Sequence, residues 1–384
     1  MKNFIYQNPV KILFGKGQIG RLQNEVPKEA RVMLTYGGGS IFKNGVYHQV
    51  IEALKGYHII EFGGIEPNPR FETLMKAVAI ARAENIDFLL AVGGGSVIDG
   101  TKFIAAAVPF EGDPWDILSK GARIKDAVKL GTVLTLPATG SEMNSNSVVT
   151  NERLQRKLAF ASPYVYPLFS ILDPEVTYSL PKRQVANGLV DSFVHVMEQY
   201  MTIPSDAPLN DRLAESILKT LIELAPDALK EIPDYENRAN LMWSSTMALN
   251  GLIGLGVPND WATHGIGHEL TALHGIDHAV TLAIVLPGLL RVMKEQKRIK
   301  LLQYAERVWN LTEGSEEERI EKCIQLTEDF FRSTGILTRL SEHNVGFETI
   351  DEIVKRFSLP GARRLGELGN IDADKIKQIL VSRV

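Results

Sequence analysis

The chain of 384 residues contains a single cysteine, Cys323. One cysteine cannot form a disulfide within the chain, and it excludes iron–sulfur clusters and zinc sites that need two or more cysteine ligands. Such sparing use of cysteine is typical of proteins from a reducing compartment. We therefore expect a cytoplasmic protein.

The sequence also lacks a surplus of positive charge and a membrane-length apolar segment. Its 42 Lys and Arg residues are outnumbered by 46 Asp and Glu residues, so the net charge is −4. Without a basic surplus to neutralise phosphates, we expect no nucleic-acid partner. Pro9, Lys11 and Lys16 interrupt the first apolar residues, which predicts that no signal peptide is present. The longest uncharged run lies between Arg238 and Asp260, and its polar and glycine residues predict a packed core helix and no membrane span.

Short apolar runs that end in glycine alternate with helix-length patterns in the first half of the chain. This alternation is typical of an α/β domain with a buried parallel sheet. From Pro181 onward the segments are longer and fit a period of 3.6 residues, which indicates helices. The sequence therefore predicts an α/β domain over residues 1–178 and an all-α domain over residues 179–384. The three apolar runs are RVMLTY (31–36), DFLLAV (87–92) and VKLGTVLTL (128–136).

Small-residue turns follow these three runs, at residues 37–40, 93–96 and 138–141. Glycine lets a backbone approach a phosphate closely, and the N-terminus of the next helix offers N–H groups and a positive dipole end. The two triple-glycine turns, at residues 37–39 and 93–95, do not match the GxGxxG fingerprint. Each turn alone can therefore equally be a tight strand-to-helix connection. Three such turns together favour a Rossmann-like dinucleotide site.

The first of these turns bears on which nicotinamide cofactor is bound. NAD sites commonly place an acidic residue on the adenosine ribose hydroxyls. The turn Gly37–Ser40 supplies no carboxylate, and Lys43 follows three residues later. A hydroxyl and a nearby cation suit a 2′-phosphate, so we expect NADP(H) as the cofactor.

Histidine and aspartate residues cluster in the second half of the chain. Asp191 and His195 stand four residues apart on a predicted helix, so their side chains share one apolar face. A buried carboxylate is costly unless it is paired or coordinated, and a simple Asp–His hydrogen bond in a core is one explanation. The other is a metal site, because His264, His268 and His278 follow within one segment broken by a glycine turn. Three imidazoles and one carboxylate suit Fe²⁺ or Zn²⁺ and leave positions open for a substrate oxygen.

Two other enzyme classes are disfavoured by single positions. The segment HGIGH resembles the HExxH of zinc proteases, but Gly265 stands where their general base is needed. A metal-free reductase would use a Tyr-x-x-x-Lys pair on a helix. The match that begins at Tyr178 contains Pro181, which cannot lie in a helix interior.

Taken together, these segments resemble the iron-containing (type III) alcohol dehydrogenase family, and the resemblance runs nearly end to end. The branch that the chain resembles most is the NADPH-dependent aldehyde reductase and butanol dehydrogenase group, which shares GGIEPNP, FLLAVGGGS and TLAIVLP. The resemblance implies a dehydroquinate synthase-like fold, with a dinucleotide-binding α/β domain before a helical metal-binding domain. The family motifs are GGGSVID (93–99), TLPATGSE (135–142), DSFVH (191–195) and WATHGIGHELTALHGIDH (261–278).

The resemblance also assigns roles to individual residues. The metal ligands it implies are Asp191, His195, His264 and His278. His268 would lie near the metal and substrate as a catalytic group, whereas His274 would have a structural role at a helix end. Substrate contacts would come from Asn144 and Leu252. The cofactor residues implied are Gly37, Gly38, Ser40, Gly94, Gly95, Ser96, Thr135, Thr139 and Lys157.

The expected activity is hydride transfer between primary alcohols or aldehydes and NADP(H), with a divalent metal polarising the carbonyl oxygen. A polyol dehydrogenase or a dehydroquinate synthase-like enzyme on the same fold is the alternative, and a regulator without catalysis is a third class. Polyhydroxylated substrates need several polar groups in the pocket. The segment MALNGLIGLGVP (247–258), which we expect to line it, is almost entirely apolar and favours a small or alkyl aldehyde.

The N-terminal segment FIYQNPVKILFG (4–15) alternates enough to form an edge strand. An exposed edge can pair with its copy across a two-fold axis. Together with the family resemblance, this predicts a homodimer.

Overall fold

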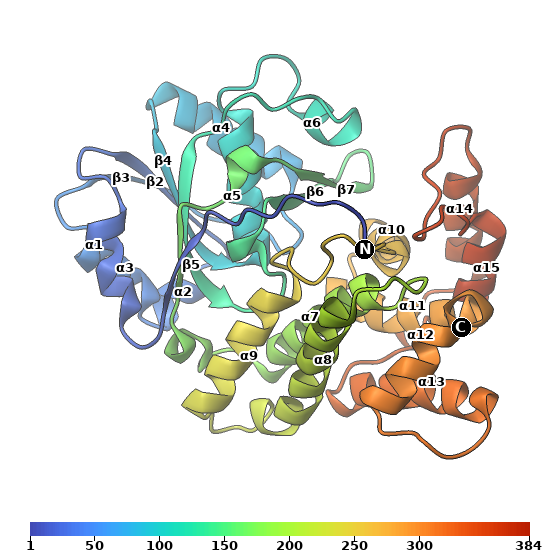
Figure 1. Cartoon of the computed structure of the whole chain (residues 1–384). Helices are drawn as coiled ribbons and strands as arrows, with labels where there is room; N and C mark the ends of the chain where they lie inside the picture. The colour runs from blue at the N-terminus through green and yellow to red at the C-terminus, as the bar shows by residue number, and fades with distance from the viewer. The chain divides into compact units, whose positions relative to one another are not determined.

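The glycine-terminated apolar runs form neighbouring strands of one parallel sheet (Figure 1). All pairs in this sheet are parallel, so the carboxyl ends of its strands, with their glycine turns, lie at the same edge. The six strands follow the order β1-β8-β5-β4-β2-β3. Their bounds are β1 Lys11–Phe14, β2 Arg31–Tyr36, β3 His58–Phe62, β4 Phe88–Gly94, β5 Lys129–Leu136 and β8 Phe169–Leu172.

Alternate residues of each strand enter two apolar cores, one on each face of the sheet. In β2, Val32 and Leu34 join one core, and Met33 joins the other. Helix α3 (Val46–Ala53) covers the first face, and helices α4 (Phe71–Ala83) and α5 (Gly95–Ala107) cover the second. The result is a three-layer arrangement, and it confirms the predicted α/β domain with a buried parallel sheet.

Four strands had no counterpart among the predicted elements. One of them is β8, which is buried but only four residues long. β3 is short and lies at the edge of the sheet, where its residues are only partly buried. β6 (Asn146–Asn151) and β7 (Arg156–Ala161) form a separate antiparallel hairpin. Short edge strands and hairpins carry a weak apolar signal because only one of their faces is buried.

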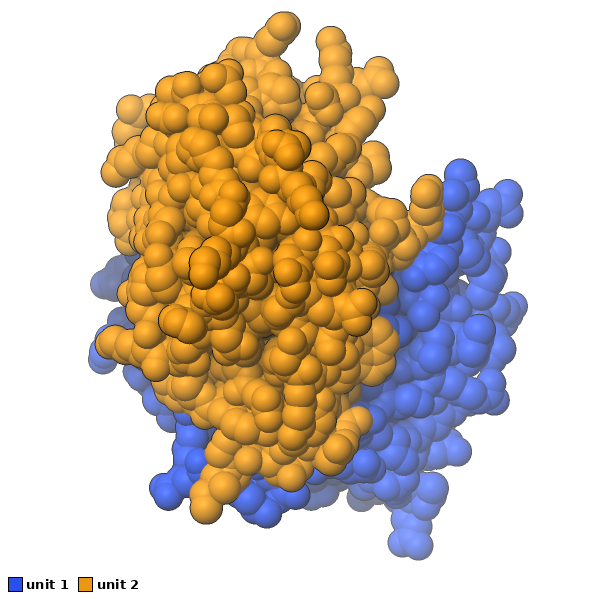
Figure 2. Space-filling view, turned by 90° about the vertical axis from the view of Figure 1, so that its left-hand side faces the viewer, with its two compact units in different colours: residues 1–6, 182–231, 247–384 blue, residues 7–181, 232–246 orange.

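The computed structural model describes residues 1–384 and divides into two compact units, shown in separate colours in Figure 2. The α/β unit contains residues 7–181 and 232–246, and the helical unit contains residues 1–6, 182–231 and 247–384. Most of helix α9 (Tyr235–Ala248) therefore belongs to the α/β unit, where Trp243 packs edge-on against Phe14. A division into domains at residue 178 stays a prediction.

The second half of the chain is helical, as expected. Helix α11, which begins at His278, is apolar on all sides and packs against α7, α10, α13 and α15. No helix combines the length and the apolarity needed to cross a membrane. The helices of the helical unit are α7 Lys182–Tyr200, α8 Pro208–Ala228, α10 Ala262–His274, α11 His278–Val292, α12 Lys294–Arg307, α13 Glu316–Ser333, α14 Phe347–Ser358 and α15 Ala373–Val381. Short helices elsewhere are α1 Leu22–Glu25, α2 Ser40–Lys43 and α6 Trp115–Ser119.

The prediction of one core helix between Arg238 and Asp260 is wrong in its second half. Helix α9 ends at Ala248, and the residues after it form turns up to Asp260. Gly251 and Gly256 have φ values of 90° and 66°, a left-handed conformation that stops a helix. Of the expected N-terminal edge strand, only Lys11–Phe14 is a strand, and it does lie at the sheet edge.

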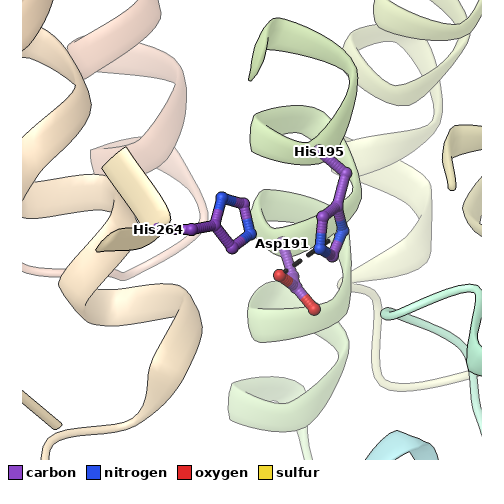
Figure 3. A group of neighbouring side chains, drawn as sticks. All are labelled: Asp191, His195 and His264. Atoms are coloured by element: carbon purple, nitrogen blue, oxygen red, sulfur yellow. Dashed lines mark ion pairs between the residues drawn. The ribbon is translucent and has the colours of Figure 1, made fainter. Parts of the chain in front are cut away.

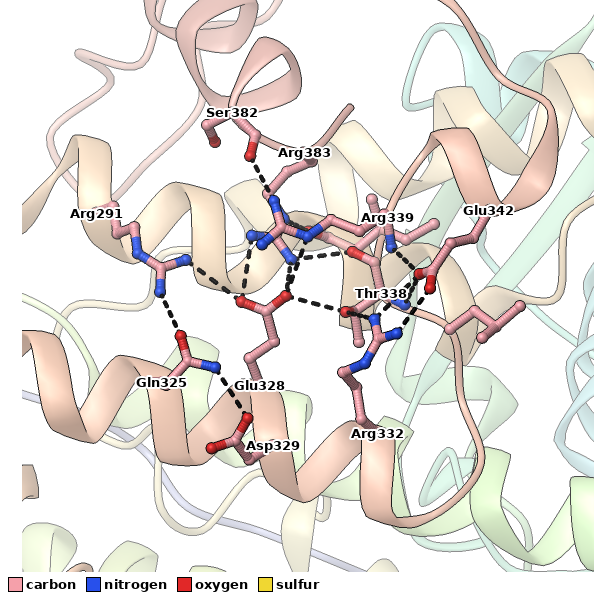
Figure 4. A network of polar contacts seen from close by, with 12 residues as sticks. Arg291, Gln325, Glu328, Asp329, Arg332, Thr338, Arg339, Glu342, Ser382 and Arg383 are labelled. Carbon is pink, nitrogen blue, oxygen red and sulfur yellow. Dashed lines mark hydrogen bonds and ion pairs between the residues drawn. The ribbon is translucent and has the colours of Figure 1, made fainter.

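A buried ionic network fixes the end of the chain to helices α11 and α13 (Figure 4). Arg383 is fully buried. Its guanidinium donates one hydrogen bond to Glu328 Oε1, at 2.5 Å, and another to the backbone oxygen of Ile284, at 2.8 Å. Arg291 and Arg339 add ion pairs to the same carboxylate at 3.4 Å. Because Ile284 lies in α11, this network fixes the helix that begins at His278.

Candidate active site

The glycine turn between β4 and α5 is built for close approach. A Cβ atom on Gly93 would lie 2.5 Å from Val97, and one on Gly95 would lie 2.4 Å from Thr139 Oγ1. Both glycines are therefore required by packing alone. The turn also ends at the N-terminus of α5, a helix long enough to carry a dipole, so the glycines that packing requires lie where free N–H groups suit a phosphate.

One residue outside this motif, Asn68, joins it to the β6–β7 hairpin. The backbone N–H of Asn68 donates to Ser96 Oγ at 3.2 Å, and its side-chain oxygen accepts from Lys157 Nζ at 2.7 Å. The structure thus brings two predicted cofactor residues, Ser96 and Lys157, to either side of Asn68. Asn68 has a φ of 58°, the left-handed conformation that asparagine tolerates best among non-glycine residues. It was not predicted as a site residue, although it lies within GGIEPNP.

A fully buried lysine on α5 organises the loop after β5. Lys102 Nζ donates to oxygen atoms of Ser141, Asn144 and Asn146, all at 2.6–3.1 Å. Asp99, one turn earlier, accepts from Ser141 Oγ at 2.5 Å. Burial lowers the pKa of Lys102 to about 8 and raises that of Asp99. Asn144, the predicted substrate residue, is thus 5% exposed with its carboxamide oxygen engaged by Lys102.

The turn after β2 contains no acidic residue, but a carboxylate from the neighbouring strand β3 contacts Tyr36, the last residue before the turn. Gly38 and Ser40 are exposed, as a cofactor-binding turn requires. Glu61, at the end of the neighbouring strand β3, accepts from the hydroxyl of Tyr36 at 3.2 Å and from that of Tyr47 at 2.6 Å. The hydrogen bond to Glu61 raises the pKa of the Tyr47 hydroxyl to about 12. The two tyrosines therefore hold a carboxylate on the strand next to the one that leads into this turn.

The predicted metal ligands converge from three helices of the helical unit. Ligand atoms of Asp191, His195 and His264 all lie within 4.8 Å of one another, and Figure 3 shows the three side chains facing one another from α7 and α10. All three are buried, with 4%, 4% and 7% of their surface exposed. His278, the first residue of α11, brings its Nε2 to 3.8 Å from Asp191 Oδ1.

The distances in this cluster suit a shared cation better than direct hydrogen bonds. His195 Nδ1 lies 3.6 Å from Asp191 Oδ1, which is longer than a hydrogen bond. Two ligand atoms about 2.1 Å from a tetrahedral metal lie about 3.4 Å apart, close to the separations observed here. Three imidazoles and one carboxylate are the nitrogen and oxygen donors that Fe²⁺ and Zn²⁺ accept. The residues therefore fit a divalent metal.

The other two histidines of this segment lie outside the cluster. The ring of His268 lies 5.3 Å from that of His278 and 6.2 Å from that of His264, so it borders the ligands. His274 is the last residue of α10, and its Nε2 lies 2.8 Å from Thr349 Oγ1. That contact agrees with the helix-end role expected for His274.

A glutamate that the sequence patterns did not single out contacts the cluster. Glu198 Oε1 accepts the backbone N–H of His264 at 2.9 Å and lies 3.1 Å from its Nδ1. Burial raises the pKa of the Glu198 carboxyl to about 7. The residue stands seven positions after Asp191, on the same face of α7, which is the signal that identifies it.

The residues of the segment expected to line the substrate pocket, 247–258, differ in burial. Ile253 and Val257 line a small hollow together with Asp211 and Lys300 of the helical unit, so they face that hollow. Leu252, the predicted substrate residue, is half-buried, and its backbone N–H donates to Asn250 at 3.0 Å. The three leucines of this segment, Leu249, Leu252 and Leu255, are all half-buried.

A glycine-rich parallel sheet in one unit and a buried histidine–aspartate cluster in the other are the combination found in metal-dependent, nucleotide-dependent dehydrogenases. The sequence matches two family models, "Iron-containing alcohol dehydrogenase" over residues 9–174 and "Fe-containing alcohol dehydrogenase family, C-terminal" over residues 185–384. The chain belongs to the iron-containing alcohol dehydrogenase family, and hence to the oxidoreductases of alcohols and aldehydes.

Individual relatives cover the whole chain. The NADPH-dependent aldehyde reductase YqhD of Escherichia coli is 56% identical over 382 residues, 99% of each chain. The probable NADH-dependent butanol dehydrogenase 1 of Bacillus subtilis is 44% identical over 385 residues, again 99% of each. A crystal structure of E. coli YqhD superposes with a TM-score of 0.98 at 55% identity, covering 100% of this chain and 99% of that one.

Proposed function

We propose that this protein is a metal-dependent aldehyde reductase that uses NADPH to reduce small or alkyl aldehydes, and that runs the reverse oxidation of primary alcohols. The observation that carries the proposal is the 56% identity over nearly the whole chain to an NADPH-dependent aldehyde reductase. The converging carboxylate and imidazoles support the metal, and the glycine turns support the nucleotide.

Asp191, His195, His264 and His278 would hold the metal. When bound, a divalent metal supplies a Lewis acid for the carbonyl oxygen, and NADPH supplies the hydride. The chain's own residues do the remaining work. The buried ligands would keep water from one side of the substrate, and His268 borders them at a half-buried position from which its ring would deliver a proton to the oxygen that becomes the alcohol.

The cofactor residues would act at both ends of the dinucleotide. Gly37, Gly38 and Ser40 would accept the adenosine end, and Gly94, Gly95 and Ser96 at the start of α5 would accept the pyrophosphate. Thr135, Thr139 and Lys157 would lie along the nicotinamide half. We favour NADPH over NADH because turn 37–40 has no carboxylate of its own and Glu61 is held by two tyrosine hydroxyls.

The substrate would be an aldehyde with an alkyl chain. Asn144 and Leu252 would contact it, and each methylene buried against an apolar wall contributes about 0.8 kcal/mol. A polyol would instead bury hydroxyls, and each unpaired hydroxyl costs roughly 1–3 kcal/mol. We therefore expect C3–C6 linear aldehydes to be preferred over glyceraldehyde by about tenfold or more in kcat/KM.

The test is NADPH oxidation by the purified protein against aldehydes from acetaldehyde to hexanal and against glyceraldehyde, with bound iron and zinc quantified in the same preparation. Efficiency that rises with chain length in metal-containing protein is the expected result. No turnover with any aldehyde would overturn the activity, and glyceraldehyde as the best substrate would overturn the alkyl preference. A cytoplasmic location and a homodimer stay predictions, the second to be checked by the solution mass.

A further inference from the structure

We propose that Glu198 is a positioning residue for the metal, which fixes the backbone and the ring of His264 through one carboxylate oxygen. This inference rests on the metal site proposed above. It adds to that site a carboxylate that is not a ligand itself but sets the direction of a ligand.

The contact is made at two points on His264. Glu198 Oε1 accepts the backbone N–H at 2.9 Å and lies 3.1 Å from Nδ1 of the ring. Glu198 is 2% exposed, so neither interaction competes with bulk water. A ring held only by its Cα–Cβ bond can rotate, but a ring held also at Nδ1 keeps one orientation.

The same oxygen also supplies the capping hydrogen bond at the N-terminus of α10. Trp261, at the N-cap position, has a φ of 61° and makes no capping hydrogen bond with its own side chain. Glu198 supplies the missing acceptor from α7, at the third residue of the helix, where capping side chains normally bond. The start of α10 is thus fixed to the helix that carries Asp191 and His195.

The hydrogen bond also selects the tautomer of His264. In its ionised form, the Glu198 carboxylate can accept from the ring only when Nδ1 carries the proton, so the lone pair of the imidazole is then at Nε2. The negative charge increases the basicity of that nitrogen. A carboxylate behind a ligating histidine is a recurrent arrangement, and its loss typically lowers metal affinity by 10–100-fold.

Glu198 is itself held firmly. Its backbone oxygen accepts the N–H of Asp260 at 2.8 Å, and the Asp260 carboxylate pairs with Lys297 Nζ at 2.5 Å. Lys297 also pairs with Glu367 at 3.0 Å. Glu367 shares this lysine but has no contact with His264 among these bonds, which makes it a matched control.

The experiment compares Glu198→Gln with Glu367→Gln. Metal is removed from each purified protein, and Zn²⁺ affinity is measured by competition with a chromophoric chelator. We expect Glu198→Gln to bind Zn²⁺ about 10–100-fold more weakly than the unmodified protein. Its thermal stability without metal should stay close to that of the unmodified protein, because the glutamine oxygen still accepts the His264 N–H. Glu367→Gln should bind Zn²⁺ with unchanged affinity.

A second readout is the visible spectrum of the Co²⁺-loaded proteins, which reports ligand geometry. We expect the Co²⁺ bands to shift in Glu198→Gln and not in Glu367→Gln. If Glu198→Gln does not fold, Glu198→Asp keeps the charge but withdraws it by one methylene, and it should weaken Zn²⁺ binding to a smaller extent.

The outcomes separate the two proposals. An unmodified protein that binds no Zn²⁺ would overturn the metal site itself. Unmodified protein that binds Zn²⁺ while Glu198→Gln, or Glu198→Asp in its place, binds it equally well would overturn only the role of Glu198. Equal losses in the Glu198 and Glu367 variants would mean that the whole ionic network matters, and would also overturn the specific positioning role.

Discussion

Lys102 donates to both oxygens of Asn144, to the backbone carbonyl at 2.8 Å and to the carboxamide oxygen at 3.1 Å. A single buried ammonium on α5 therefore fixes a loop that follows β5. That loop carries Thr139 on one side and Asn144 on the other, both predicted as site residues. The helix that begins at the glycine turn and the loop beside it are joined through this one side chain.

Replacing this lysine tests how much the loop depends on it. Lys102→Met keeps the length of the side chain but leaves Asp99 and the carbonyl oxygens of the loop without their cation. Removing one partner of a buried ionic cluster costs about 3–5 kcal/mol, so we expect a clearly lower Tm and weaker NADPH binding. The control is Lys76→Met, at an exposed position on α4. Equal Tm values for the two variants would show that the ammonium is not needed.

The metal ligands can be tested against a histidine of the same segment. We expect His264→Ala or His278→Ala to lose activity and to retain less metal, because each removes one of four converging donors. His274→Ala is the control, because His274 lies at the C-terminal end of α10 and its ring contacts Thr349 of α14. Activity and metal content are measured side by side. A metal-free His278→Ala protein with full activity would contradict the ligand assignment.

The sequence was sufficient for the layers of the fold and for most of the histidine cluster. Buried parallel strands are continuous apolar runs, and β2, β4 and β5 were predicted on that signal. Asp191 and His195 share a helix face at a spacing that the sequence itself displays. Both signals can be read from neighbouring residues, because the period of a helix or strand fixes which side chains face the same way.

What the sequence did not indicate depends on contacts between distant segments. Glu198 lies on the same face of α7 as Asp191, but that spacing alone does not show its role, and its contact with His264 becomes visible only in the structure. Lys102 would ordinarily be a solvated lysine, and its burial becomes visible only when the loop around Asn144 is placed. The turns after Ala248 were missed because the apolar residues of this segment suit a helix as well as a buried loop, although its glycines disfavour a helix.

The stability of the helical unit should depend on pH through Glu328. Burial alone would raise the pKa of this carboxyl, but the hydrogen bond and the charge of Arg383 outweigh burial and lower the pKa to about 2. Because the folded-state pKa is below the unfolded value of about 4.3, the stabilisation is present above that value. It is lost as the pH falls from there towards 2, by up to about 3 kcal/mol.

Glu328→Gln should therefore lower the Tm most at pH 6, and the difference from the unmodified protein should shrink as the pH is lowered to 3.5. Glu317→Gln, at an exposed pair with Lys294, is the control and should have little effect at either pH. A Tm difference for Glu328→Gln that stays constant between pH 6 and pH 3.5 would contradict this titration.

The cofactor preference can be changed at one glycine. We expect NADPH to be used at least tenfold more efficiently than NADH, which corresponds to about 1.4 kcal/mol. A Cβ atom added at Gly38 meets no other atom within 4 Å, so Gly38→Asp introduces a carboxylate without a clash. The new charge would oppose the 2′-phosphate and leave the ribose hydroxyls of NADH free to bond to it. Gly38→Ala makes the same change to the backbone without the charge, and kcat/KM is measured with both cofactors for each variant. We expect the preference to fall in Gly38→Asp and to persist in Gly38→Ala. Equal efficiency with NADPH and NADH in the unmodified protein would show that turn 37–40 does not discriminate between them.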